Sequence, residues 1–347
     1  MDYLLTNTWT HAAHGHARGE IVQIKDYLAK RNAQSEIISI SPEFGECSNF
    51  SLGNLAHNLK FDHTRFLKKW VDGRLIQDLE RNLLSAVGRK RYTKTKIIIT
   101  SARFGHVLQL KKITKIQNHL HIRLLDSPNS DEEWENLKLL VNESESRVKL
   151  AFEFRATAEM AAKYIDGVSH VPAAQSLTSF SKKQIIDRNR LGIFFPVGRK
   201  SMDNKIEFFL EALSDFYPYV KLPDYIDSRK FIQRYPKVIF MPRNLPNNMF
   251  DSILNQIKVG VLGHENYVNQ SSAYASYFAS KNIPVIVSEN NAFFSEFRHF
   301  NFHDIPEQKA LLRNLVKQLM KEELNLEQSP YSRYASQAWE SFLEIEP

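Results

Sequence analysis

The chain has 347 residues, of which 43% are hydrophobic and 24% charged, so it is long enough for two globular domains and too apolar for a disordered chain. Its single cysteine, Cys47, excludes an internal disulfide, which fits a reducing compartment, and no apolar run reaches the roughly 18 residues that a membrane helix needs. The net charge of +7 favours an anionic partner, which a nucleotide, an anionic membrane surface or a nucleic acid could provide.

The first half of the sequence alternates short apolar runs with amphipathic stretches. Short apolar runs predict strands, and apolar residues spaced three and four apart predict helices. The predicted strands are 3–9, 35–41, 96–100, 121–125, 148–154 and 168–172, and the predicted helices are 21–31, 64–87 and 158–165. This alternation indicates a parallel sheet with helices on both faces.

A polar stretch follows, and the alternation then restarts. The second set of predicted strands is 191–197, 237–241, 258–263 and 284–288, and its helices are 206–216, 250–257, 271–280, 308–324 and 332–345. We therefore expect an α/β fold with two doubly wound, Rossmann-like domains facing one another across a cleft. The expected parts are an N-terminal domain 1–172, a linker 173–190, a C-terminal domain 191–329, and a last helix at about 330–347 that could pack back on the first domain.

A basic turn follows the strand predicted at 191–197. It reads GRKSMDNK and contains Gly198, Arg199 and Lys205. Ligands of doubly wound sheets bind at the carboxyl ends of the strands, and a guanidinium with an ammonium group could together offset a diphosphate. The alternative is a solvated loop that happens to be basic.

The start of the helix predicted at 271–280 is a second candidate anion site. Ser271 or Ser272 would cap this helix, and the backbone N–H groups of Gln270, Ser271 and Ser272 would point into the same cleft. An ordinary helix cap is the alternative.

Histidines follow two predicted strands of the first domain. The loop HAAHGH contains His14 and Gly15, where the glycine would let the backbone approach a ligand, and His106 lies in TSARFGH after the strand 96–100. Either His14 or His106 could act as a general base, and a solvated or core histidine is the alternative. The histidine spacing matches no standard zinc pattern, so no metal is expected.

Three further charged segments could be functional sites or ordinary surface. The basic run 88–96 is either a solvated surface or a docking surface for an anionic membrane, and no nucleic-acid recognition motif is present. The acidic stretch 126–135 is interpreted as a turn and a helix start without chemistry. Glu153 and Arg155, at the end of another predicted strand, are candidates for the cleft.

The basic turn resembles the phosphate-binding turn of GT-B glycosyltransferases, particularly glycosyltransferase family 4. That turn consists of a strand, a Gly-Arg pair, a lysine six residues after the arginine, and an amphipathic helix, as in 191–213 here. SYFASKNIPVIVS (276–288) resembles a helix and strand of the same family, and 10–41 resembles its opening loop, first helix and second strand. The resemblance implies a nucleotide-diphosphate sugar donor in the C-terminal domain, an acceptor in the N-terminal domain, and no metal or other cofactor.

The chain departs from the family where its E-x7-E carboxylates should stand. Asn269 and Tyr277 occupy these two positions, which in the family lie near the donor sugar and the ribose. The resemblance still implies that this segment contacts the nucleotide, while the ribose contact and the stereochemistry stay open. Glu265 is close enough in sequence to replace one carboxylate.

We therefore expect a metal-independent glycosyltransferase of the hexosyltransferase type. By resemblance, it would act on a glycan or lipid-linked acceptor in cell-surface polysaccharide or glycolipid synthesis. No signal peptide is expected, which suggests a cytoplasmic protein that could also bind the inner face of the membrane. The alternatives are a catalytically silent GT-B-like subunit and a nucleotide-sugar epimerase of similar architecture. The base (UDP or GDP), the sugar, the acceptor and the oligomeric state stay open.

Overall fold

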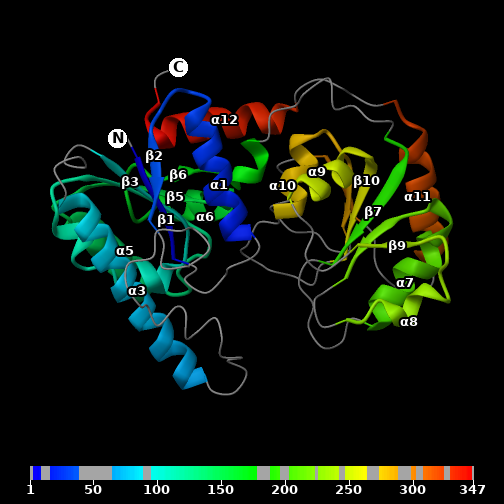
Figure 1. Cartoon of the computed structure of the whole chain (residues 1–347), viewed down its shortest axis with the longest axis horizontal. Helices are drawn as coiled ribbons and strands as arrows, with labels where there is room; N and C mark the ends of the chain where they lie inside the picture. Colours follow the sequence, from blue (N-terminus) through cyan, green and yellow to red (C-terminus); the bar gives the residue numbers. More distant parts are fainter. Residues whose placement is uncertain are drawn as a thin grey trace. The chain divides into compact units, whose positions relative to one another are not determined.

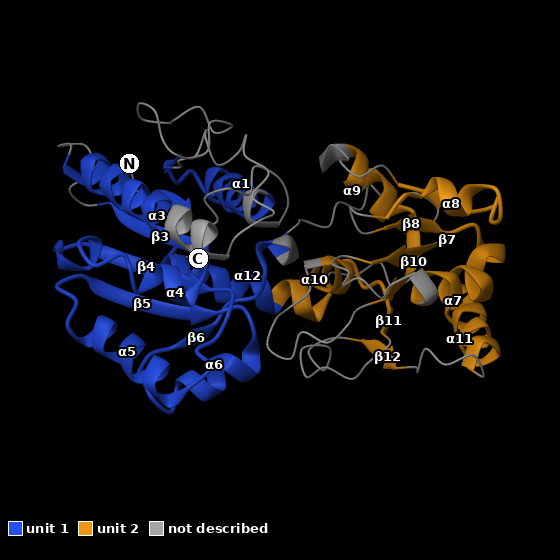
Figure 2. Cartoon of the chain, turned by 90° about the horizontal axis from the view of Figure 1, so that it is seen from below, with its two compact units in different colours: residues 1–177, 269–271, 334–347 blue, residues 178–268, 272–333 orange. Residues whose placement is uncertain are grey.

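The chain folds into two compact units (Figures 1 and 2). The computed structural model describes residues 3–8, 16–38, 65–88, 95–177, 188–195, 203–222, 226–241, 247–263, 273–287, 298–301, 308–323 and 329–345. Within that part of the chain, unit 1 comprises the residues up to 177 together with 334–345, and unit 2 comprises 188–263, 273–323 and 329–333.

Unit 1 contains a six-stranded parallel sheet. Its strand order is β2-β1-β3-β4-β5-β6, so the order reverses between β1 and β3. The strands are β1 (Tyr3–Asn7), β2 (Ser35–Ile37), β3 (Lys96–Ala102), β4 (His119–Leu124), β5 (Arg147–Phe152) and β6 (Ser169–His170).

Helices cover both faces of this sheet (Figure 1). On one face lie α3 (Arg65–Gly88), α4 (Phe104–Val107), η3 (Ile113–Lys115), α5 (Asp131–Asn142) and α6 (Arg155–Ala161). On the other face lie α1 (His16–Ala29), η4 (Ala174–Leu177) and the C-terminal part of α12 (Pro330–Leu343). Trp339 of α12 is fully buried there and donates from Nε1 to the carbonyl of Pro172 at 3.0 Å.

Unit 2 contains a second six-stranded parallel sheet, ordered β12-β11-β10-β7-β8-β9. Its strands are β7 (Arg190–Phe194), β8 (Tyr219–Lys221), β9 (Ile239–Phe240), β10 (Ile257–Leu262), β11 (Val285–Val287) and β12 (His299–Asn301). Its helices are α7 (Asp203–Leu213), η6 (Ser214–Phe216), α8 (Arg229–Ile232), α9 (Asn247–Asn255), α10 (Ala273–Ser280) and α11 (Lys309–Lys321).

The helices of unit 2 also divide between two faces of the sheet. α7, α8 and α11 share one core with Ile193 and Phe195. Phe194 alternates to the other face, where its ring meets Phe250 of α9 and Tyr274 of α10. Helix α10 also packs closely on β10, because a β-carbon at Gly260 would lie 2.7 Å from the ring of Phe278.

The predicted fold class is confirmed, because both units are parallel sheets covered by helices. The short strands β8 and β12 were not predicted, because each has only three residues and too little apolar sequence to stand out. Residues 174–177, placed in the expected linker, form η4 and bury Ala174 and Leu177 in unit 1. Residues 188–190 belong to unit 2, with Arg188 buried and β7 starting at Arg190.

Candidate functional site

The strand order of unit 2 reverses between two neighbouring strands. β7 and β10 pair in parallel, and the chain continues from them into helices on opposite faces, α7 after β7 and α10 after β10. In open α/β sheets, ligands bind where the order reverses, at the carboxyl ends of the strands. The candidate nucleotide site is therefore the carboxyl edge of β7 and β10.

Lys205 lies at this edge. It is the third residue of α7, in the first turn, and its side chain is half-buried. The N-terminus of a helix favours anions, because its first backbone N–H groups have no partner within the helix. The other predicted phosphate ligands, Gly198, Arg199, Asn269, Gln270, Ser271 and Ser272, lie outside the described residues, as does Glu265.

Tyr277 packs inside unit 2. Its side chain is 4% exposed, its ring centre lies 6.2 Å from that of Phe250, and the Nζ of Lys281 lies 5.0 Å from the ring. Lys281 is itself buried and donates to the Oδ1 of Asn255 at 2.8 Å. These contacts give Tyr277 a packing role, and its contact with a nucleotide stays a prediction.

Several aromatic residues near the carboxyl edge of β7 were not predicted as part of this site. The ring of Phe194, at the end of β7, lies 5.0 Å from that of Tyr274, in the first turn of α10. Phe250 lies 5.8 Å from Tyr274, with the Nζ of Lys221 5.7 Å from the Phe250 ring. The available signal in the sequence was the aromatic residue Phe194 inside the predicted strand 191–197.

The carboxyl edge of the sheet in unit 1 is a second candidate site. The pairing of β3 with β4 shifts register between Ile99 and Ala102, and Ser101 has a left-handed φ of 44°. Such a bulge bends the strand and re-aims the residues that follow it. Arg103 then donates from its backbone N to the Oγ1 of Thr8 at 3.0 Å, which joins the ends of β3 and β1.

His106 lies at this edge, as expected. Its Nδ1 is 3.1 Å from the carbonyl oxygen of Thr8. Because a carbonyl only accepts, Nδ1 carries the proton of the neutral ring and Nε2 is its basic nitrogen. His14 and Gly15, the other predicted residues of unit 1, lie outside the described residues.

Asp126 was not predicted as a site residue. It follows β4, and its Oδ1 accepts a 2.6 Å hydrogen bond from the backbone N of Phe104 at the start of α4. Burial raises the pKa of Asp126, while the Phe104 hydrogen bond and the charge of Arg103 act to lower it. The acidic stretch 126–135 therefore does contribute a side chain to this edge, and its position after a predicted strand was the available signal.

Glu153 is buried instead of facing the edge of the sheet. Its Oε2 lies 2.8 Å from Nη2 of Arg123, whose Nη1 lies 2.7 Å from Oε1 of Glu20 on α1. Arg123 also donates from Nε to the carbonyl of Val171 at 2.8 Å, and all three charged side chains are almost fully buried. The expectation that Glu153 lines a cleft is corrected, because the carboxylate holds β5 to β4. Arg155, the next candidate, is exposed and lies 5.0 Å from the ring of Tyr334.

His170 makes the stability of unit 1 depend on pH. Its Nε2 is 3.0 Å from the carbonyl of Glu153 and its Nδ1 is 2.7 Å from the hydroxyl of Tyr334. Burial, followed by the charge of Arg155, lowers the pKa of His170 to about 4. The unfolded chain therefore binds the proton first, and stability should be lost as the pH falls from the unfolded pKa of about 6.5 toward 4.

We expect the free energy of unfolding to fall by about 2 kcal/mol between pH 7 and pH 5 on account of His170 alone. Urea unfolding at both pH values, on the wild type and on His170→Asn, measures this contribution. The variant should show a smaller loss on acidification, and an equal loss in both proteins would rule out this account of His170.

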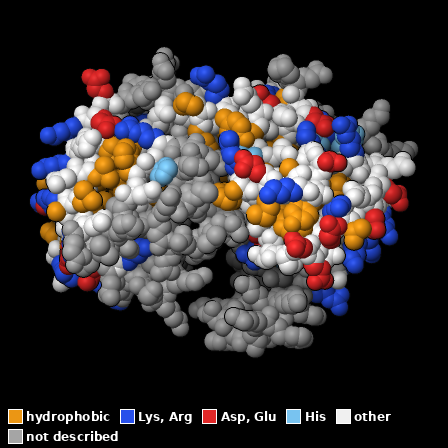
Figure 3. Space-filling view, turned by 180° about the vertical axis from the view of Figure 1, so that it is seen from behind, with side chains coloured by type: hydrophobic (Ala, Val, Ile, Leu, Met, Phe, Trp, Pro, Cys, Tyr) orange, Lys and Arg blue, Asp and Glu red, His pale blue; other side chains and the backbone are white. Residues whose placement is uncertain are grey.

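Charged side chains are mixed over the face of the molecule shown in Figure 3. Lys and Arg alternate there with Asp and Glu among the described residues, and apolar side chains form small patches. Most of the basic run, residues 89–94, lies outside the described residues. Among the helices that the structure describes, none has the length and apolar character needed to span a bilayer.

Similarity to known proteins is found at the level of structure. No protein-family model matches the sequence, and no curated protein matches it significantly. UDP-N-acetylglucosamine 2-epimerase from Rickettsia bellii superposes with a TM-score of 0.55 at 10% identity, over 99% of this chain and 96% of that chain. A glycosyltransferase from Rickettsia africae ESF-5 gives 0.54 at 10% identity, over 99% of each chain.

HepE from Anabaena, solved in complex with UDP, gives a TM-score of 0.52 at 11% identity, over 99% of this chain and 98% of that chain. Identities this low establish similarity of fold only. The solved structures that this chain resembles have the GT-B fold, which confirms the expected fold and leaves membership of glycosyltransferase family 4 a proposal.

Proposed function

We propose that this chain is a GT-B glycosyltransferase that moves a sugar from a nucleotide-diphosphate sugar to an acceptor. The observation that carries the proposal is the strand order of unit 2, which brings the end of β7 and the first turn of α7 to the point where the order reverses. The basic turn, with Arg199 before α7 and Lys205 inside it, belongs to this connection. The fold of a UDP complex, HepE, supports a nucleotide at such a site.

In this proposal, Arg199 and Lys205 bind the diphosphate and stabilise the charge that develops on the departing nucleotide. Electrostatic stabilisation of this kind is usually the largest single contribution to catalysis. The N–H groups of Gln270, Ser271 and Ser272 assist through the start of α10. Arg199 and Lys205 supply the positive charge that a divalent metal supplies in other enzymes, so the proposed reaction needs no metal.

The acceptor would bind at the carboxyl edge of unit 1. His106 or His14 would take the proton of the attacking hydroxyl, and Gly15 would allow close approach of the backbone. Asp126 fixes the start of α4 and so supports the position of His106. We propose a glycan or lipid-linked acceptor in cell-surface polysaccharide or glycolipid synthesis, with the enzyme at the cytoplasmic side of the membrane.

Nucleotide-sugar epimerisation is the second candidate function. The fold of the Rickettsia bellii epimerase favours it, because one architecture serves both reactions. Asn269 and Tyr277 stand where the family has carboxylates, and this favours a third hypothesis. The chain would then be a catalytically silent subunit that supports a partner transferase.

An assay with labelled UDP-, GDP- and ADP-sugars distinguishes a transferase from an epimerase and from a silent subunit. The purified chain is incubated with each donor, alone and with a membrane lipid and glycan extract. A transferase should release nucleoside diphosphate and move the label into a larger product when the extract is present. Conversion of the donor sugar without extract would indicate an epimerase, and binding without any turnover would indicate the silent subunit.

A further inference from the structure

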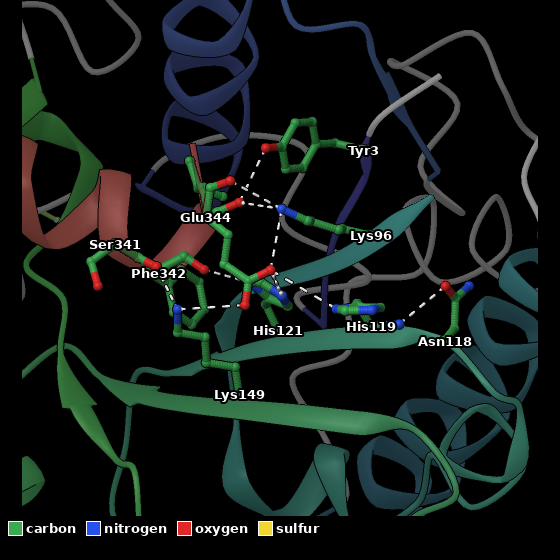
Figure 4. Close-up of polar contacts among 10 residues, drawn as sticks. Tyr3, Lys96, Asn118, His119, His121, Lys149, Ser341, Phe342 and Glu344 are labelled. Atoms are coloured by element: carbon green, nitrogen blue, oxygen red, sulfur yellow. Dashed lines mark hydrogen bonds and ion pairs between the residues drawn. The ribbon is translucent and has the colours of Figure 1, made fainter. Parts of the chain in front are cut away.

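A cluster of polar side chains lies at the amino-terminal edge of the sheet in unit 1, at the opposite ends of the strands from the candidate acceptor site. His119 and His121 begin β4, and their spacing of two residues places them on the same face. They meet Glu344, the residue that follows α12, together with Lys96 of β3 and Lys149 of β5 (Figure 4).

Glu344 holds its carboxylate in this cluster through an uncommon backbone conformation. Its φ is 54°, in the left-handed region, and the hydrogen bonds from Glu344 N to Ser341 O and from Ile345 N to Glu340 O close the end of the helix. This closure normally takes glycine, because other residues are strained there. A glutamate at this position suggests that its side chain has a role that outweighs the strain.

We propose that His119, His121 and Glu344 bind one zinc ion. Oε2 of Glu344 lies 3.9 Å from Nδ1 of His119 and 3.9 Å from Nε2 of His121, and all three ligand atoms lie within 4.8 Å of one another. Tetrahedral zinc, with bonds of about 2.0–2.2 Å, holds its ligand atoms about 3.3 Å apart, so small side-chain movements complete the geometry. Imidazole and carboxylate ligands both suit this metal.

The contacts of His121 prepare it as a ligand. Its Nδ1 is 2.5 Å from the carbonyl oxygen of Phe342, so Nδ1 carries the proton and Nε2 presents its lone pair on the side of Glu344. The ring is also buried, with a side chain that is 1% exposed. A carbonyl bond to the remote nitrogen is the arrangement that orients histidine ligands in metal sites.

Two lysines compete for the same carboxylate. Nζ of Lys96 lies 3.2 Å from Oε2 of Glu344, and Nζ of Lys149 lies 3.8 Å from Oε1. Each has a backbone acceptor as well: Lys96 donates to the carbonyls of Leu343 and Glu344 at 3.1 Å, and Lys149 donates to that of Ser341. The carboxylate can therefore bind a metal while both ammonium groups stay hydrogen-bonded, and their positive charge weakens the binding of a cation.

The ion would join β4 to the end of α12, because the two histidines and the glutamate belong to these two elements. His119 is 46% exposed, which gives the ion a route of entry and leaves a fourth position for water. Zinc should therefore stabilise the docking of the last helix on unit 1 and raise the melting temperature of the chain.

Calorimetric titration of the metal-free full chain with zinc chloride at pH 7, together with thermal unfolding, tests the site. We expect one ion per chain at this site, a higher melting temperature with zinc, and no effect of magnesium, which prefers oxygen ligands. His119→Ala should weaken this binding at least about tenfold. Glu344→Gly, which keeps the left-handed backbone and removes the carboxylate, should do the same.

A paired variant, His11→Ala with His16→Ala, removes two of the three histidines of the HAAHGH loop and should keep the binding. If Glu344→Gly fails to fold, His119→Ala decides alone, because His119 is half-exposed at the start of a strand. Zinc binding by His119→Ala that equals the wild type, or no binding by the wild type, would overturn the proposal.

Discussion

Replacing Arg199 and Lys205 together by alanine is expected to lower kcat/KM for sugar transfer at least about a thousandfold, or about 4 kcal/mol. Removal of a single group that stabilises a developing negative charge costs about 10²–10³ in rate, and here both proposed cations are lost. Lys205 lies in the first turn of α7, where its charge adds to the positive end of the helix dipole. Steady-state kinetics with the donor that the wild type uses measure the loss.

The matched control is Arg234→Ala with Lys237→Ala, which removes the same charge from the surface of unit 2. These side chains are about half-exposed, at 53% and 49%, and pair with acidic residues of the same unit. The control should keep wild-type kinetics. If the two double variants lose activity to the same degree, the net charge of unit 2 matters and the phosphate-binding role of Arg199 and Lys205 is refuted.

Replacing Arg123 by methionine is expected to lower the free energy of unfolding by about 3–5 kcal/mol. The variant leaves the carboxylates of Glu20 and Glu153 buried without the guanidinium that lies 2.7 and 2.8 Å from them. Arg123 also lies 5.4 Å from the ring of Trp339, so its loss disturbs the packing of α12 as well. Urea unfolding monitored by circular dichroism measures the change.

Two further variants test the cause of that loss. The triple variant Arg123→Met, Glu20→Gln, Glu153→Gln leaves no buried charge and should recover much of the stability. Arg234→Met removes two exposed ion pairs, with Glu207 and Glu211, and should cost less than about 1 kcal/mol. A triple variant as unstable as Arg123→Met alone would show that packing, and not the uncompensated charge, dominates.

The parallel sheets could be predicted because their central strands are unbroken apolar runs. KIIIT and KVGVLG, for example, became β3 and β10, which are buried on both faces. Strand β8, Tyr219–Lys221, has only three residues, and its stability comes from pairing with β7 and β9. Such strands depend on tertiary contacts, which local sequence does not record.

Residues of the candidate sites could be predicted only where a polar or charged side chain follows closely after a predicted strand. The positions of His106 and Lys205 after β3 and β7 were predicted in this way, their roles stay predictions, and Asp126 follows the same rule. The burial of Glu153 could not be foreseen, because its partner Arg123 lies 30 residues earlier, inside an apolar strand. The proposed zinc site could not be predicted for the same reason, because Glu344 meets His119 and His121 only after α12 has folded onto the sheet.

Binding of nucleoside diphosphates to the purified chain tests the central claim most directly. Calorimetric titration with UDP, GDP and ADP should show one of them binding with a stoichiometry of one. The matching monophosphate should bind at least about tenfold more weakly, because a diphosphate engages both proposed cations. Arg199→Ala with Lys205→Ala should abolish that preference. Failure of all three diphosphates to bind, or equal binding by the double variant, would contradict the account.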